Sequence, residues 1–149
     1  MLYIENAKVC TPDQVIERGA VLVDGGRIAG VGPSGAVPRP ADARVIDAAG
    51  RTLAPGFIEL QFNGAFGDDF TDDPAAIWRV AEKLPRYGTT SFLPTIITSP
   101  LEKIATGQAV VTGRQPDHFR GARPLGLHVE GPFLHLSPGH LARCREGFG

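Results

Sequence analysis

The sequence has little of what marks membrane, extracellular or nucleic-acid-binding proteins. It holds only two cysteines, Cys10 and Cys144, whose separation fits neither a disulfide framework nor a metal-ligand spacing, so we expect free thiols. No stretch approaches the ~20 consecutive apolar residues of a membrane span, and no basic region followed by an apolar run marks a secretory signal. Fifteen basic residues against sixteen acidic ones leave a net charge of −1. The chain therefore has no broad positive electrostatic field that would attract nucleic acid or anionic lipid. These absences predict a cytoplasmic protein with a small-molecule ligand and neither a nucleic-acid nor a membrane partner.

The first third of the 149 residues is typical of a small all-β unit. Segments 2–9, 19–32 and 43–56 are rich in valine and isoleucine, and Asp-Gly-Gly at 24–26 joins two apolar runs as a tight hairpin does. Segment 33–42 contains three prolines and a glycine, which favours a surface loop. We therefore predict a β unit over residues 1–54.

The remaining residues, 55–149, alternate strand and helix patterns. We expect strands over 56–64, 89–99 and 122–131, with a helix over 72–84 between the first two. A second helix is expected after Ser99. Ser99 and Glu102 would form a capping box at its start, with Pro100 at the first helical position. Such alternation predicts an α/β fold of parallel strands joined by right-handed crossovers and buried on both faces.

Four polar side chains stand at the ends of the first and third of these strands. Because side chains alternate along a strand, Gln61 and Asn63 share one face, and His128 and Glu130 share another. The carboxyl ends of parallel strands carry the chemistry in α/β folds. The four side chains are therefore expected to converge on one mouth.

Glu130 is the candidate metal ligand, since a carboxylate beside an apolar run is costly to bury unless it is paired or bound to a cation. The pattern alone leaves open a structural role, as a loop cap or as the ion-pair partner of Arg123 or Arg143. His128 is interpreted as a residue that supports a ligand, or as a satisfied core histidine, rather than as a direct ligand.

The amides and the other histidines are weaker candidates. Gln61 and Asn63 compete poorly for transition metals and suit a bound water or substrate, although satisfying nearby backbone is the simpler alternative. His118 is interpreted as a surface residue. His135 and His140 follow Glu130 closely enough to be candidates for the site.

Three segments, in order, carry a family resemblance: "LAPGFIELQFNGAFGDDF" at 53–70, "YGTTSFLPTIITS" at 87–99 and "LGLHVEGPFL" at 125–134. Together they closely resemble the N-terminal part of the N-acetylglucosamine-6-phosphate deacetylases of the amidohydrolase superfamily. The resemblance implies a distorted (β/α)8 TIM barrel of the metal-dependent hydrolase type, flanked by a small β-sandwich of which residues 1–54 would form the first part. Residues 55–149 would then be the N-terminal part of the barrel.

The resemblance also implies an activity, the hydrolysis of N-acetylglucosamine 6-phosphate to glucosamine 6-phosphate and acetate in amino-sugar catabolism. The segment Gln61-Phe62-Asn63 replaces the His-x-His of many superfamily members and is similar to the branch that uses one divalent metal ion, zinc or a related ion. In that branch the glutamate equivalent to Glu130 is a ligand. Two further histidine ligands and a catalytic aspartate follow later in the family, so no catalytic residue is expected within this chain. Intact relatives are commonly homodimers.

The sequence also departs from the family pattern. A complete barrel needs about 250 residues, whereas residues 55–149 suffice for about three βα units of ~30 residues. The family's Gly-Ala-His is missing, and His140 in Gly139-His140 is the candidate substitute for substrate contact. We therefore expect a truncated barrel, an inactive fragment, and a final ~15 residues from a truncated or frame-shifted gene, since they lack helical periodicity. The alternatives are a dihydroorotase-like cyclic amidase and a non-catalytic fragment that needs a complementary chain.

Overall fold

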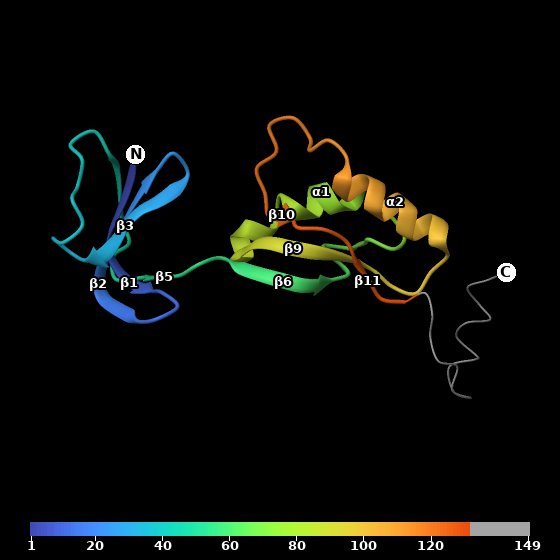
Figure 1. Ribbon diagram of the computed structural model, residues 1–149, viewed down its shortest axis with the longest axis horizontal. Helices are drawn as coiled ribbons and strands as arrows, with labels where there is room; N and C mark the ends of the chain where they lie inside the picture. The colour runs from blue at the N-terminus through green and yellow to red at the C-terminus, as the bar shows by residue number, and fades with distance from the viewer. Residues whose placement is uncertain (132–149) are drawn as a thin grey trace. The chain divides into compact units, whose positions relative to one another are not determined.

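The structure, a computed structural model, describes residues 1–131 of the chain. The described residues form two compact units, one over Met1–Pro55 and one that begins at Gly56. The first is a mixed β-sheet and the second combines parallel strands with helices, as the two blocks in Figure 1 show. Each unit has its own hydrophobic core.

The first unit is one sheet with the order β3-β2-β1-β4, in which β5 also pairs with β1. Its strands are β1 (Leu2–Cys10), β2 (Val15–Asp24), β3 (Arg27–Pro33), β4 (Arg44–Asp47) and β5 (Thr52–Leu53). The first three strands are antiparallel, whereas β4 and β5 run parallel to β1. The predicted hairpin at residues 24–26 is confirmed, because β2 and β3 pair up to Asp24 and Arg27.

Two apolar clusters hold this sheet together. Tyr3, Ala20 and Val37 form one cluster, and the segment 33–42 contributes Val37 to it. Tyr3 is only slightly exposed, and its hydroxyl donates a hydrogen bond of 3.1 Å to the Val37 carbonyl. The loop predicted over 33–42 is thus anchored to the sheet by one buried side chain and one hydrogen bond.

The second unit is built around β9 (Thr89–Ile96). On one side β9 pairs with β6 (Phe57–Phe62), and on the other with β10 (Arg123–Pro124) and β11 (His128–Val129), all in parallel. The predicted parallel order is therefore confirmed. Two helices, α1 (Ala76–Ala81) and α2 (Leu101–Thr112), lie on the same side of the sheet in Figure 1. A short hairpin of β7 (Gly64–Ala65) and β8 (Asp68–Asp69) follows β6.

The core of the second unit lies between the sheet and the helices. Its fully buried side chains include Phe70, Ile77, Phe92 and Ile96. The rings of Phe62 and Phe92 meet edge to face with centroids 5.6 Å apart. Since Phe92 and Ile96 are four residues apart on β9, both point to the side of the core, and the odd-numbered residues between them point away.

The helix ends differ from the predictions. Helix α1 covers only Ala76–Ala81 of the helix expected at 72–84, and a 3₁₀ turn, Leu84–Tyr87, with the donorless Pro85 in its first turn begins at the last expected residue. The capping box at Ser99 is wrong: Pro100 is itself the N-cap of α2, and the Ser99 hydroxyl donates to the Ile97 carbonyl at 2.8 Å. Ser99 stands one residue too early to reach the helix amides.

The expectation of strands buried on both faces is also wrong. Phe57, Ile58 and Leu60 of β6 are 69%, 58% and 63% exposed. Within residues 56–131, β6 pairs with β9 alone and the helices cover one side of the sheet, which leaves the other surfaces of β6 open. The expected strand over 122–131 is interrupted, because the six residues from Arg123 to His128 lie opposite only five, from Ser91 to Thr95.

Candidate functional site

The carboxyl ends of β6 and β11 lie on either side of β9 at the same edge of the sheet. There the side-chain amide of Gln61 donates a 3.4 Å hydrogen bond to Oε2 of Glu130, at the long end of hydrogen bonding. Both side chains are exposed. The structure therefore brings together one amide and the carboxylate that the sequence places at the mouth.

The backbone of Glu130 is held while its carboxylate stays open. Its amide donates to the Ile96 carbonyl at 3.0 Å, and its carbonyl accepts a 2.9 Å bond from the Thr98 hydroxyl. Among residues 1–131 the carboxylate forms no ion pair, so the alternative partner Arg123 is not engaged. The other alternative, Arg143, lies outside the described residues, as does Cys144.

His128 lies half-buried two residues before Glu130. Its Nδ1 is 3.2 Å from the hydroxyl of Thr95, a fully buried residue of β9. The same hydroxyl accepts a 2.9 Å hydrogen bond from the backbone amide of Phe62. His128 is thereby connected to β6 through a single side chain of the central strand.

A glycine with positive φ follows each of the two polar strand ends. Gly64, after Asn63, has φ of 151°, and a Cβ there would stand 2.0 Å from the Asp68 carbonyl oxygen. Gly131, after Glu130, has φ of 110°. In this geometry only glycine avoids strain, so both strand ends turn sharply beside their polar side chains. The carbonyl of Asn63 accepts a bond from the Phe70 amide, which closes the turn after β6.

Sequence reasoning missed two residues of this arrangement. Thr95 is one, and Glu59 is the other, since its Oε1 accepts a 3.2 Å bond from the Gln61 backbone amide. Glu59 could have been found, because it stands two residues before Gln61 on the same face of an apolar strand. Thr95 could have been suspected from the preceding Pro94, which gives a central strand no amide donor.

The described residues fit a metal ion only in part. No group of three or more histidine, cysteine, aspartate or glutamate side chains that could hold a metal occurs within residues 1–131. The open carboxylate of Glu130 suits one position in a coordination sphere, and further ligands have to come from elsewhere. His118 is exposed, as predicted. His135 and His140 lie outside the described residues.

The main ion-pair cluster of the second unit stands apart from this edge. Arg79 of α1 contacts Asp68 at 2.6 Å and Asp73 at 2.8 Å. The hydrogen bond from Arg79 lowers the pKa of Asp68, and its positive charge adds to the effect. Asp68 therefore joins the β7–β8 hairpin to α1.

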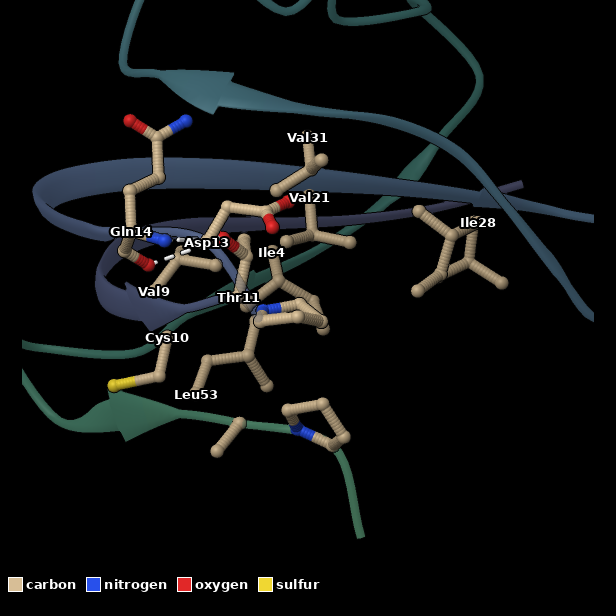
Figure 2. A pocket seen from close by; sticks show the side chains of 14 residues that line it. Ile4, Val9, Cys10, Thr11, Asp13, Gln14, Val21, Ile28, Val31 and Leu53 are labelled. Atoms are coloured by element: carbon tan, nitrogen blue, oxygen red, sulfur yellow. Dashed lines mark hydrogen bonds between the residues drawn. The ribbon is translucent and has the colours of Figure 1, made fainter.

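A groove of about 530 Å³ belongs wholly to the first unit (Figure 2). Its lining is mainly aliphatic and includes Ile4, Val21, Ile28, Val31 and Leu53. Its polar end is used locally, since the Thr11 hydroxyl donates to the Gln14 carbonyl and accepts from the Gln14 amide. The groove therefore offers apolar surface, whereas the groups that can do chemistry gather in the second unit.

Comparison with known proteins first defines the class, which is that of the amidohydrolases. No family model matches the chain. The structure superposes on the N-acetylglucosamine-6-phosphate deacetylase of Pasteurella multocida with a TM-score of 0.77 and 30% identity, covering 98% of this chain and 42% of that one. The deacetylase from Mycobacterium smegmatis, at 23% identity and a TM-score of 0.70, shares the fold.

Curated relatives narrow the class to one family. The N-acetylglucosamine-6-phosphate deacetylase of Bacillus subtilis is 34% identical over 140 residues, which are 89% of this chain and 34% of that protein. The Homo sapiens protein of the same name is 45% identical over 103 residues, 64% of this chain and 24% of that protein. The resemblance is confirmed: the chain matches the N-terminal part of these deacetylases and spans about a third of their length or less. In residues 1–131, no helix has the length and apolar character needed to cross a membrane.

Proposed function

We propose that this chain supplies the N-terminal part of a metal-dependent deacetylase that hydrolyses N-acetylglucosamine 6-phosphate to glucosamine 6-phosphate and acetate. The observation that supports the proposal is the meeting of Gln61 and Glu130 at the carboxyl edge of β6, β9 and β11. The similarity to the Bacillus subtilis and Pasteurella multocida deacetylases supports the same substrate. On this proposal residues 1–54 are part of a β-sandwich and residues 55–149 are the first part of a TIM barrel.

Each residue at the edge has a proposed part. Glu130 would hold one divalent metal ion, zinc or a similar ion, and Gln61 would orient the Glu130 carboxylate by its hydrogen bond. When bound, such an ion polarises an amide carbonyl and lowers the pKa of water. Gln61 and Asn63 are proposed to hydrogen-bond water or substrate. His128 is proposed to support the metal ligand Glu130 without binding the ion itself. His140 keeps its proposed part in substrate contact.

The proposal assigns one ligand to this chain and leaves the rest of the site outside it. Since residues 1–131 contain no group of three metal-ligating side chains, the remaining ligands and the catalytic aspartate are expected from other parts of the protein. The 149-residue chain is therefore proposed to be inactive alone. The cyclic amidase alternative is not proposed, because the curated relatives reported above bear the deacetylase name.

A paramagnetic metal tests the ligand, since it reports weak binding by one carboxylate. We expect substoichiometric Mn²⁺ to broaden the backbone amide signals of Gln61, Asn63 and Glu130 in the chain, and Glu130→Gln to abolish this effect. Glu102→Gln, on the exposed first turn of α2, is the matched control and is expected to change nothing. Broadening that persists at the same amides in Glu130→Gln would refute the ligand assignment.

An activity assay tests whether the chain is inactive without the rest of the site. The purified chain, with a divalent metal, is incubated with N-acetylglucosamine 6-phosphate while released acetate and bound metal are measured. We expect no turnover. Acetate release by the 149 residues alone would show that they hold a complete site, contrary to the proposal.

A further inference from the structure

Thr95 is fully buried in β9, yet its hydroxyl contacts groups from both neighbouring strands. The backbone amide of Phe62 in β6 donates to it at 2.9 Å, and Nδ1 of His128 in β11 lies at 3.2 Å. Its third contact is the Leu93 carbonyl oxygen of its own strand, at 3.4 Å. One hydroxyl therefore connects the two strands that carry the candidate site.

The contact with Phe62 compensates for an irregular ladder. The pairing of β6 with β9 shifts register between Glu59 and Phe62, and the partner of Phe62 is Pro94, which has no amide hydrogen. The Phe62 amide bonds the Thr95 hydroxyl, and the Gln61 amide bonds the Glu59 side chain. Both amides at the irregularity are thus satisfied by side chains, which fixes the stretch that presents Gln61.

The contact with His128 selects one tautomer of the ring. A hydroxyl has one hydrogen to donate and two lone pairs to accept with. The Phe62 amide uses one lone pair, and the Leu93 carbonyl, which can only accept, takes the hydrogen. All three contacts are satisfied together only if His128 carries its proton on Nδ1 and donates it to the second lone pair. Nε2 is then the acceptor nitrogen of the neutral ring.

We propose that Thr95 is a positioning residue for the site. Its hydroxyl ties the end of β6 and the start of β11 to β9, which lies between them, so that Gln61 reaches Glu130, and it keeps His128 in the Nδ1-protonated tautomer. The free Nε2 can then accept a hydrogen bond from a water or hydroxyl at the edge. The role of this edge as a metal and substrate site rests on the proposed function. The contacts of Thr95 are properties of the chain without metal or substrate.

Nitrogen-15 spectra of the histidine rings test the tautomer in the whole, metal-free chain. At about pH 8.5, about two units above the ordinary histidine pKa, we expect His128 to show a pyrrole-type Nδ1 and a pyridine-type Nε2, its signals assigned by their loss in His128→Gln. Thr95→Ser keeps the hydroxyl and is expected to keep this pattern. Thr95→Val keeps the shape but removes the hydroxyl, and is expected to move the proton to Nε2.

Amide hydrogen exchange provides the second readout. In Thr95→Val the Phe62 amide loses its acceptor, so we expect its exchange to accelerate by roughly tenfold or more, with Thr95→Ser close to wild type. A wild-type ring protonated on Nε2 would overturn the proposal, even if Thr95→Val failed to fold. Wild-type ring signals and Phe62 exchange in a folded Thr95→Val would also overturn it.

Glu130→Gln separates this inference from the proposed function. That variant removes the proposed metal ligand but none of the contacts of Thr95, so we expect an unchanged His128 ring pattern. Persistent Mn²⁺ broadening in Glu130→Gln, together with the expected effects of the Thr95 variants, would refute the ligand and leave the positioning role standing. The reverse combination would refute the positioning role alone.

Discussion

Nε2 of Gln61 lies 3.4 Å from Oε2 of Glu130, a contact between residues that are 69 positions apart in the sequence. It exists because β6 and β11 both run parallel to β9 and end at the same edge. The contact is long and exposed, so its contribution to the stability of the fold is small. Its importance lies in the direction that it gives to the Glu130 carboxylate.

Two substitutions of Gln61, by leucine and by glutamate, are expected to change the metal affinity in opposite directions. Gln61→Leu removes the donor that orients Glu130, and loss of such a partner lowers metal affinity about tenfold or more. Gln61→Glu places a second carboxylate beside Glu130 and is expected to tighten Mn²⁺ binding. Titration of amide broadening against Mn²⁺ measures both effects. Unaltered binding in the two variants would argue that the ion is held elsewhere.

The turn after β6 depends on the absence of a side chain at Gly64. A Cβ at Gly64 would meet the Asp68 carbonyl at 2.0 Å, whereas one at Gly67, with φ of 89°, would meet nothing within 4 Å. Gly67→Ala therefore bears only the cost of positive φ, about 1–2 kcal/mol, and Gly64→Ala is expected to cost more because the β7–β8 hairpin must open. Urea unfolding followed by Trp78, the single tryptophan, measures the difference. Equal losses would contradict the steric argument.

The site could be predicted from the sequence as far as local patterns reach. Alternation placed Gln61 and Glu130 at strand ends, and the order of strands and helices implied parallel pairing, which brings those ends together. Pro94 draws attention to Thr95, but the contacts of its hydroxyl could not be predicted, because they depend on an irregular register opposite Pro94 that no single-strand pattern contains.

The predictions of strand burial and of the helix cap failed for a different reason. The apolar pattern of β6 predicts burial, but exposure of Ile58 and Leu60 depends on which neighbours lie against them, and residues 56–131 place a strand on one side of β6 only. The Ser99 cap failed by one residue, because the helix begins at Leu101 and Ser99 bonds backward to Ile97. Both errors concern tertiary geometry rather than residue preference.

The Arg79 cluster is expected to make the stability of the second unit depend on pH. Arg79 lowers the pKa of Asp68 below its ordinary value of 3.8, so the ionised pair contributes fully above that value and loses its contribution as pH falls through the lower folded-state pKa. The urea midpoints of wild type and Arg79→Gln should therefore differ at neutral pH, and the difference should shrink as pH falls below 3.8 and through the lower folded-state pKa of Asp68. Arg86→Gln, at an exposed arginine without an ion pair in the described residues, should show no such convergence. A constant difference between wild type and Arg79→Gln would refute the linkage.

The two tyrosines of the chain allow a buried hydroxyl in the first unit to be compared with an exposed one in the second. Tyr3 is 4% exposed and donates to the Val37 carbonyl at 3.1 Å, whereas Tyr87 is 66% exposed. Tyr3→Phe leaves that carbonyl without its partner in a buried cluster and is expected to destabilise the first unit by about 1–3 kcal/mol. Tyr87→Phe should stay within about 0.5 kcal/mol of wild type. Exchange of the β2 amides, among them Ala20 and Val21, measures the loss, and equal exchange in the two variants would mean that the segment 33–42 is not held by this bond.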